Sequence, residues 1–248
     1  MTSGEPKLEI LADPEALARR AANWLFTAAT AKVGVFAVAL SGGSTPRAVY
    51  ERLAGPPYRE QFPWSRTHWF WGDERFVPHD DPRSNFRMAR EALLSRAPIP
   101  AVNIHPIPTE GVGPGAAAAA YESELMTFLG AKQLDAKRPL FDAMLLGLGL
   151  DGHTASLFPG AAALAERNLW VAAATDPEGG TRITLTYPAI ESSRQTAFLV
   201  SGREKSAMFR RLCRGDAALP AAGLRPVGEL WLFADAAAAS NLPDWGAS

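Results

Sequence analysis

The sequence predicts an α/β fold with a mostly parallel sheet and helices on both of its faces. Short apolar or β-branched runs alternate with longer stretches of helical periodicity, which is typical of strand–helix–strand units. Several of these runs are apolar throughout, as in strands that helices cover on both sides. No stretch has the composition of a long interdomain linker, so we expect residues 1–248 to form a single domain.

The expected elements follow from these patterns in chain order. Pro14 suits the first turn of a helix, and the alanine-rich stretch from residue 116 continues with helical spacing. Strands are expected at residues 33–40, 67–71, 141–146, 169–173, 195–200 and 229–233. Helices are expected at residues 13–30, 46–53, 85–95, 116–129 and 203–213.

Charge and composition argue against several classes of protein. The 25 basic and 26 acidic residues give a formal charge of −1, so no general excess of positive charge is available for nucleic acid or an anionic membrane. No apolar run approaches the ~20 residues of a membrane helix, and the N-terminus lacks the layout of a signal peptide. The single cysteine, Cys213, fits a reducing compartment. We therefore expect a cytoplasmic protein that recognises anions only locally.

A glycine-rich turn follows the first expected strand and leads into a helix. Its residues are Ser41, Gly42, Gly43, Ser44 and Thr45, followed by Pro46. Pro46 suits the first helical position and Ser44 or Thr45 can cap, so the turn's amides and the helix dipole favour a bound phosphate. The spacing and the lysine of a nucleotide P-loop are missing. An ordinary capped strand-to-helix turn is the alternative interpretation.

A second glycine-rich loop, residues 147–153, follows the expected strand at 141–146 and formally matches G-x-G-x-x-G. A dinucleotide site is disfavoured because Pro159 and Gly160 interrupt any following helix, and because Asp151 would place negative charge beside a pyrophosphate. His153 is instead a candidate general base that Asp151 could orient. The alternative is that His153 only hydrogen-bonds its own loop.

Further charged residues lie at expected strand ends. Asp73 and Arg75 follow the strand at 67–71. Arg182 comes after a glycine-rich turn, and Lys205 follows Gly202 at the start of an expected helix. Taken singly, either basic residue is more commonly a solvated surface charge. Together with the turn at 41–45, Arg182 and Lys205 would make a phosphate clamp. A metal site formed by Asp73, Asp151 and His153 is weakly supported, so we expect no metal. His68 and His105 are expected to be structural, and the role of His79 is left open.

Five motifs taken together resemble the 6-phosphogluconolactonase family. They are SGGSTP at 41–46, WGDERFV at 71–77 with SNF at 84–86, GLGLDGHTASLFPG at 147–160, RITLTYPAI at 182–190 and SGREK at 201–205. The resemblance implies a fold similar to those of glucosamine-6-phosphate deaminase and ribose-5-phosphate isomerase, with a Rossmann-like sheet that binds a sugar phosphate instead of a dinucleotide. It also implies hydrolysis of 6-phospho-D-glucono-1,5-lactone to 6-phosphogluconate, the second step of the oxidative pentose phosphate pathway.

The resemblance assigns roles to the candidate residues. The turn at 41–45 with Arg182 and Lys205 would hold the phosphate, and Asp73 would contact the substrate. His153 would activate water, Asp151 would orient His153, and the oxyanion would be met by Arg75 or by backbone amides of residues 149–152. No cofactor, metal or covalent intermediate is implied.

Two other functions remain to be weighed. A glucosamine-6-phosphate deaminase-like isomerase carries an acid five residues after the histidine, where this chain has Phe158. A non-catalytic sugar-phosphate sensor is disfavoured by the presence of both Asp151 and His153. The expected partner is a small sugar-phosphate lactone, with no nucleic acid and no membrane, and the protein is expected to be a monomer or small homo-oligomer.

Overall fold

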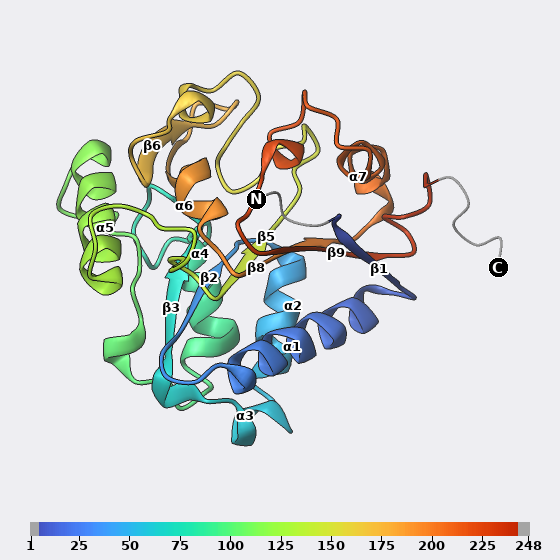
Figure 1. The fold of residues 1–248 in the computed structure, drawn as a ribbon, viewed down its shortest axis with the longest axis horizontal. Helices are drawn as coiled ribbons and strands as arrows, with labels where there is room; N and C mark the ends of the chain where they lie inside the picture. Colours follow the sequence, from blue (N-terminus) through green and yellow to red (C-terminus); the bar gives the residue numbers. More distant parts are fainter. Residues whose placement is uncertain (1–4, 243–248) are drawn as a thin grey trace.

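The computed structural model describes residues 5–242 and has a six-stranded sheet at its centre (Figure 1). Every neighbouring pair in this sheet is parallel, which confirms the predicted α/β class. In spatial order the strands are β1 (Lys7–Leu11), β9 (Glu229–Asp235), β8 (Gln195–Val200), β5 (Ala143–Leu146), β2 (Phe36–Leu40) and β3 (Thr67–Trp71). Strands β2 and β5 are buried along their whole lengths, as their apolar sequences predict.

Helices cover both faces of the central sheet, as predicted (Figure 1). Helices α1 and α2 pack together on one side, and α6 and α7 lie on the other. The side chain of Asp13 accepts a hydrogen bond from the Ala16 amide at 2.7 Å and caps α1. The helices are α1 (Pro14–Ala31), α2 (Ser44–Leu53), α3 (Tyr58–Gln61), α4 (Asn85–Ala89), α5 (Pro114–Leu129), α6 (Tyr187–Glu191) and α7 (Ser206–Cys213). No helix within residues 5–242 has the length and apolar character needed to span a bilayer.

A second, antiparallel sheet was not predicted. It consists of β4 (Asp73–Arg75), β7 (Thr181–Leu185) and β6 (Val171–Thr175), in that order. The expectation that residues 169–173 join the parallel sheet is therefore wrong. Gly72 links the two sheets, because its N–H donates to Leu40 O at 2.9 Å and its carbonyl accepts from the Leu185 amide at 2.8 Å.

The start of α2 also differs from the expectation. The helix begins at Ser44, with Gly43 as its N-cap, and no side chain caps it. Pro46 therefore occupies the third helical position rather than the first, and neither Ser44 nor Thr45 acts as the cap. Because the cap residue has φ of 106°, in the region that favours glycine, the turn needs Gly43 itself at this position.

The strand order places the ends of β2 and β5 side by side while their outgoing connections diverge. From β2 the chain continues to β3 on one side, whereas β5 lies on the other side and leads on to β8. Such a switch point creates a crevice at the carboxyl ends of parallel strands, where open α/β sheets bind ligands. Both glycine-rich loops begin at this point.

Candidate active site

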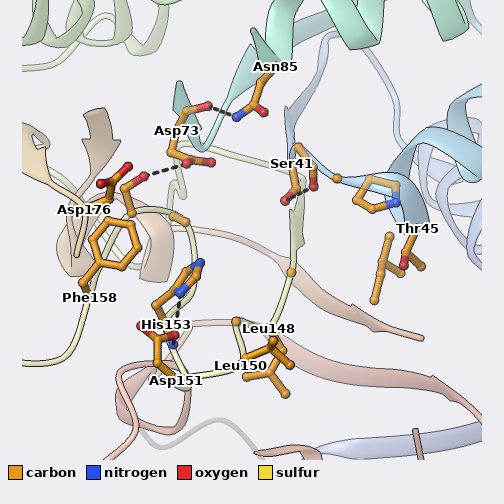
Figure 2. Close-up of a pocket in the computed structure, with 18 of the residues that line it drawn as sticks. Ser41, Thr45, Asp73, Asn85, Leu148, Leu150, Asp151, His153, Phe158 and Asp176 are labelled. Atoms are coloured by element: carbon orange, nitrogen blue, oxygen red, sulfur yellow. Dashed lines mark hydrogen bonds and ion pairs between the residues drawn. The ribbon is translucent and has the colours of Figure 1, made fainter. Parts of the chain in front are cut away.

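A cavity of about 540 Å³ lies at the carboxyl ends of β2, β5 and β8 and is lined by all of the site residues predicted from the sequence. These residues come from five separate segments of the chain. They are Ser41, Gly42, Gly43, Ser44, Thr45, Asp73, Arg75, Asp151, His153, Arg182 and Lys205. Figure 2 labels Ser41, Thr45, Asp73, Asp151 and His153 among them. The predicted convergence of the mid-chain imidazole and the serine-glycine turn is thus found.

The turn after β2 presents free backbone amides to this cavity. The buried hydroxyl of Tyr50 accepts from the Ser41 amide at 2.9 Å and donates to Ser41 O at 2.8 Å, which fixes the first peptide of the turn. The amides from Gly42 to Thr45 have no hydrogen-bond partner within residues 5–242. Consecutive unpaired amides at the start of a helix are suited to an anion.

Asn85 lies directly against this turn. A Cβ on Gly42 would lie 2.0 Å from Asn85 Oδ1, so only glycine fits there. The Asn85 amide nitrogen donates to Asp73 O at 2.9 Å, and its backbone N–H donates to the buried carboxylate of Glu74 at 2.7 Å. Asn85 therefore joins the turn after β2 to the segment after β3.

His153 and Asp151 form a directed pair in the loop after β5. Asp151 Oδ1 lies 2.6 Å from His153 Nδ1 and also accepts the His153 backbone N–H at 3.1 Å. Partial burial acts to raise the pKa of Asp151, but the hydrogen bonds from His153 outweigh it and hold this pKa below its usual value. An ionised carboxylate only accepts hydrogen bonds, so Nδ1 carries a proton and Nε2 is the ring nitrogen left to exchange a proton with a ligand or water.

Glycines make this loop possible. A Cβ on Gly149 would lie 2.1 Å from His153 Nδ1, and a Cβ on Gly152 would lie 2.4 Å from a methyl group of Leu219. The Gly149 amide donates to His153 O at 2.8 Å and the Gly152 amide donates to Gly149 O at 3.2 Å. These two amides are therefore committed within the loop, which leaves Arg75 and the other amides near residues 149–152 as candidate donors to an oxyanion.

Asp73 and Arg75 border the cavity from the second sheet. Asp73 is buried and accepts a hydrogen bond from Ser156 Oγ at 2.7 Å (Figure 2). Arg75 donates from Nη1 to the carbonyl of Arg83, while its Nε–H is buried without a partner. Such an unsatisfied guanidinium N–H is a strong donor held in place by its surroundings.

The two other basic residues are arranged differently. Arg182 Nε donates to Asp176 Oδ2 at 2.9 Å, so this guanidinium already has an anionic partner. Lys205 makes no ion pair within residues 5–242. The turn that precedes Lys205 is held by Asp235, whose carboxylate accepts a hydrogen bond from the Gly202 amide at 3.1 Å. Of the three basic residues that line the cavity, Arg182 is ion-paired, whereas Arg75 and Lys205 make no ion pair within residues 5–242.

Among the lining residues to which the sequence patterns gave no role in the site, four make specific contacts there. Asn85 appeared only as part of a motif, and Ser156 and Asp176 were given no role. For Asp176, the glycine-rich turn before Arg182 was a signal that could have indicated a role. Phe158, noted only for its missing acid, packs on the His153 ring with a centroid separation of 4.7 Å. These contacts join segments distant in the sequence, which no local pattern reveals.

The remaining histidines lie outside this cavity. His68 Nδ1 is 2.9 Å from His105 Nε2, and His105 Nδ1 is 2.7 Å from Glu124. His79 Nε2 lies 2.9 Å from Ile107 O, which gives the residue left open a structural contact. Across residues 5–242, no three His, Cys, Asp or Glu side chains are grouped so as to hold a metal ion.

Comparison with known proteins identifies the family. A model of the glucosamine-6-phosphate isomerases/6-phosphogluconolactonase family matches residues 12–232. The chain belongs to this family. Its members include a 6-phosphogluconolactonase of Nostoc sp. that is 41% identical over 241 residues, covering 95% of this chain and 98% of that protein. A 6-phosphogluconolactonase of Synechocystis sp. is 41% identical over 244 residues, covering 96% and 98%.

Solved structures agree with this family assignment. The 6-phosphogluconolactonase of Trypanosoma brucei superposes with a TM-score of 0.81 at 29% identity, covering 97% of this chain and all of that one. A monomeric glucosamine-6-phosphate deaminase gives a TM-score of 0.80 at 22% identity, covering 94% and 99%, and so shares the fold. The resemblance to the lactonase family expected from the motifs is confirmed.

Proposed function

We propose that this protein is a 6-phosphogluconolactonase, which hydrolyses 6-phospho-D-glucono-1,5-lactone to 6-phospho-D-gluconate in the oxidative pentose phosphate pathway. The observation that carries the proposal is that one cavity contains both the Asp151–His153 pair and the turn of unpaired amides after β2. The names of the full-length relatives support the same substrate.

The phosphate of the substrate would bind at the turn after β2. The amides from Gly42 to Thr45 supply unpaired donors, and Lys205 supplies an uncompensated positive charge. Arg182 borders the same cavity and adds a guanidinium. These contacts exist equally in the ground state and the transition state, so they lower KM more than they raise kcat.

His153 would act as the general base. With Nδ1–H directed at Asp151, Nε2 accepts a proton from water, and the resulting hydroxide adds to C1 of the lactone. The carbonyl becomes a tetrahedral oxyanion. Collapse of this intermediate breaks the bond between C1 and the ring oxygen, and His153 returns the proton to that oxygen. The ionised Asp151 stabilises the imidazolium between these steps.

Arg75 is the proposed electrostatic partner of the oxyanion. Its guanidinium borders the cavity and its Nη2 makes no hydrogen bond within residues 5–242, whereas the amides of Gly149 and Gly152 are already used within the loop. Donors that are fixed before the reaction stabilise charge where it develops. Asp73, held by Ser156, is proposed to accept hydrogen bonds from sugar hydroxyls.

The deaminase-like alternative lacks support at one position. The acid expected five residues after the histidine in those enzymes is replaced by Phe158, whose ring contacts His153. Phenylalanine cannot transfer a proton during opening of a sugar ring. A sensor would need only the phosphate contacts, so the ordered Asp151–His153 pair favours catalysis.

A coupled assay tests the proposal. Fresh lactone is generated from glucose 6-phosphate by a dehydrogenase, and its opening is followed with and without this protein. We expect acceleration well above spontaneous hydrolysis and no reaction with glucosamine 6-phosphate. Opening at the spontaneous rate would refute the proposed activity, and release of ammonia from glucosamine 6-phosphate would establish the deaminase alternative.

The remaining expectations belong to the same proposal. We propose a single-domain cytoplasmic enzyme that works without cofactor or metal, binds neither nucleic acid nor membrane, and is a monomer or small homo-oligomer. Dialysis against a strong chelator should leave activity unchanged, and restoration of lost activity by a divalent cation would contradict the metal-free mechanism. Sedimentation analysis determines the oligomeric state.

A further inference from the structure

A short turn joins β6 to β7 at the edge of the cavity, and Asp176 is its first residue. The Asp176 amide donates to Gly180 O at 2.9 Å, and the Gly179 amide donates back to Asp176 O at 3.0 Å. A Cβ on Gly180 would lie 2.5 Å from Asp176 Oδ2, so glycine leaves room for the carboxylate to fold over the turn. The side chain is thereby held against the cavity rather than in solvent (Figure 2).

The two oxygens of Asp176 have separate tasks. Oδ1 accepts from the backbone amides of Gly180 at 2.7 Å and Glu178 at 3.0 Å. Oδ2 accepts from Arg182 Nε at 2.9 Å and lies 2.8 Å from Arg182 Nη2. Both side chains are largely buried, with 10% of the Asp176 and 19% of the Arg182 side chain exposed. The turn amides hold the Asp176 carboxylate through Oδ1, and the carboxylate in turn holds the Arg182 guanidinium through Oδ2.

This contact uses only one edge of the guanidinium. Arginine has N–H groups on two further edges, and Arg182 borders the cavity, so donors remain for a ligand. Arg182 also lies directly opposite Arg75 in the β4–β7 register, which places two positive side chains on one face of the second sheet. Asp176 offsets the repulsion between them.

We propose that Asp176 is a positioning residue that holds Arg182 in the orientation needed to bind the phosphate of the substrate. A long side chain that is ordered before binding loses less conformational entropy when the ligand arrives. The inference rests on the proposed function, because Arg182 is placed there as a phosphate ligand. It assigns to the turn between β6 and β7 a role in affinity rather than in the chemical step.

Asp176→Asn removes the charge and one ion-pair partner while keeping the size of the side chain. We expect KM for the phosphorylated lactone and Kd for 6-phosphogluconate to rise about tenfold, the equivalent of ~1.4 kcal/mol. We expect kcat to change less than about twofold, and hydrolysis of unphosphorylated glucono-1,5-lactone to stay the same, since neither depends on phosphate contacts. An unchanged or lower KM would overturn the proposal.

A matched control exists outside the cavity. Asp216 accepts from Arg211 Nε at 2.7 Å and from the Ala218 amide at 3.0 Å, the same combination of an arginine and a turn amide. Asp216→Asn should leave KM and kcat at wild-type values. If it raises KM as much as Asp176→Asn does, the effect reflects general destabilisation and the proposal is wrong.

Two further variants separate positioning from folding of the turn. Gly180→Ala displaces the Asp176 carboxylate without changing any charge, and should raise KM in the same way. In an Arg182→Ala background, Asp176→Asn should have no additional effect on KM, because the residue through which it acts is gone. A full additional effect in that background would show that Asp176 acts only on the turn.

Binding measurements keep this inference separable from the catalytic proposal. One outcome is that the wild-type protein binds 6-phosphogluconate more tightly than gluconate without accelerating lactone opening, and in that case the proposed activity fails. The Kd for 6-phosphogluconate, compared between wild type and Asp176→Asn, then still tests the positioning role of Asp176. If the wild type binds both equally, Arg182 is no phosphate ligand and the inference fails.

Discussion

The imidazole of His153 is held from one side by Asp151 and packed against Phe158, which leaves Nε2 for the reaction. His153→Ala should lower kcat by about 10²- to 10⁴-fold, the range that general base catalysis contributes. Binding of 6-phosphogluconate should stay within a few-fold of wild type, because the phosphate contacts are elsewhere. Steady-state kinetics and calorimetric titration measure the two effects. Near-normal turnover by the purified variant would contradict the base assignment.

Asp151 is expected to affect both catalysis and stability. Asp151→Asn should lower kcat by about 10²-fold or more, because an amide no longer ensures the Nδ1–H form of the ring. The pKa of Asp151 is lowered in the folded protein by its hydrogen bonds with His153, against the opposing effect of partial burial. Its contribution to stability is therefore present above the ordinary pKa of 3.8 and is lost as the pH falls through the folded value.

Urea unfolding of the wild type and of Asp151→Asn checks this pH dependence. The difference in unfolding free energy should be largest near neutral pH and should shrink in acid below pH 3.8. A difference that grows toward acid would mean that the carboxylate is not stabilised by folding.

The loop after β5 depends on the absence of a side chain at Gly149. Gly149→Ala would place a Cβ 2.1 Å from His153 Nδ1, so the ring or the loop must move. We expect a loss of kcat approaching that of His153→Ala, with a smaller effect on product binding. Gly115→Ala in α5 is the control, because a Cβ there meets nothing within 4 Å. Equal activity of the two alanine variants would show that the loop tolerates the change.

The sequence predicted the buried strands well because their apolar runs reflect burial on both faces. It failed for β1, β4 and β7. Strand β4 consists of Asp73, Glu74 and Arg75 and becomes a strand only because β7 pairs with it. Strand β1 lies at the edge of the sheet and is partly exposed, so its sequence has no continuous apolar run.

The candidate site was predicted more completely than the second sheet that borders it. Its residues follow glycine-rich turns at strand ends, which are local signals, and their order matches a known family. Partners such as Asp176 and Asn85 were missed because their importance lies in a contact with another segment. The start of α2 was misplaced because Gly43, at positive φ, takes over as the N-cap and shifts Pro46 inward.

Gly72 links the two sheets, and Ser156 links the loop after β5 to Asp73 of the second sheet. We therefore expect them to unfold together, as a single-domain chain would. Urea unfolding should give coincident transitions by far-UV circular dichroism, by activity and by the fluorescence of Trp170, which precedes β6. The difference between wild type and Trp170→Phe isolates this last signal. An earlier transition at Trp170 would show that the antiparallel sheet unfolds independently.

The divergence of the chain at the ends of β2 and β5 separates the two glycine-rich connections, which can therefore change independently during evolution. In the proposed mechanism, the turn after β2 contributes to binding of the anionic tail, and the loop after β5 supplies the general base that acts on the lactone. We therefore expect that mutations between Gly147 and Phe158 can change the reaction that is catalysed while binding of a phosphorylated sugar is retained. We expect proteins with this fold to diversify in this way while keeping the same class of substrate. The twelve residues 147–158 are also the place to begin when a new reaction is engineered.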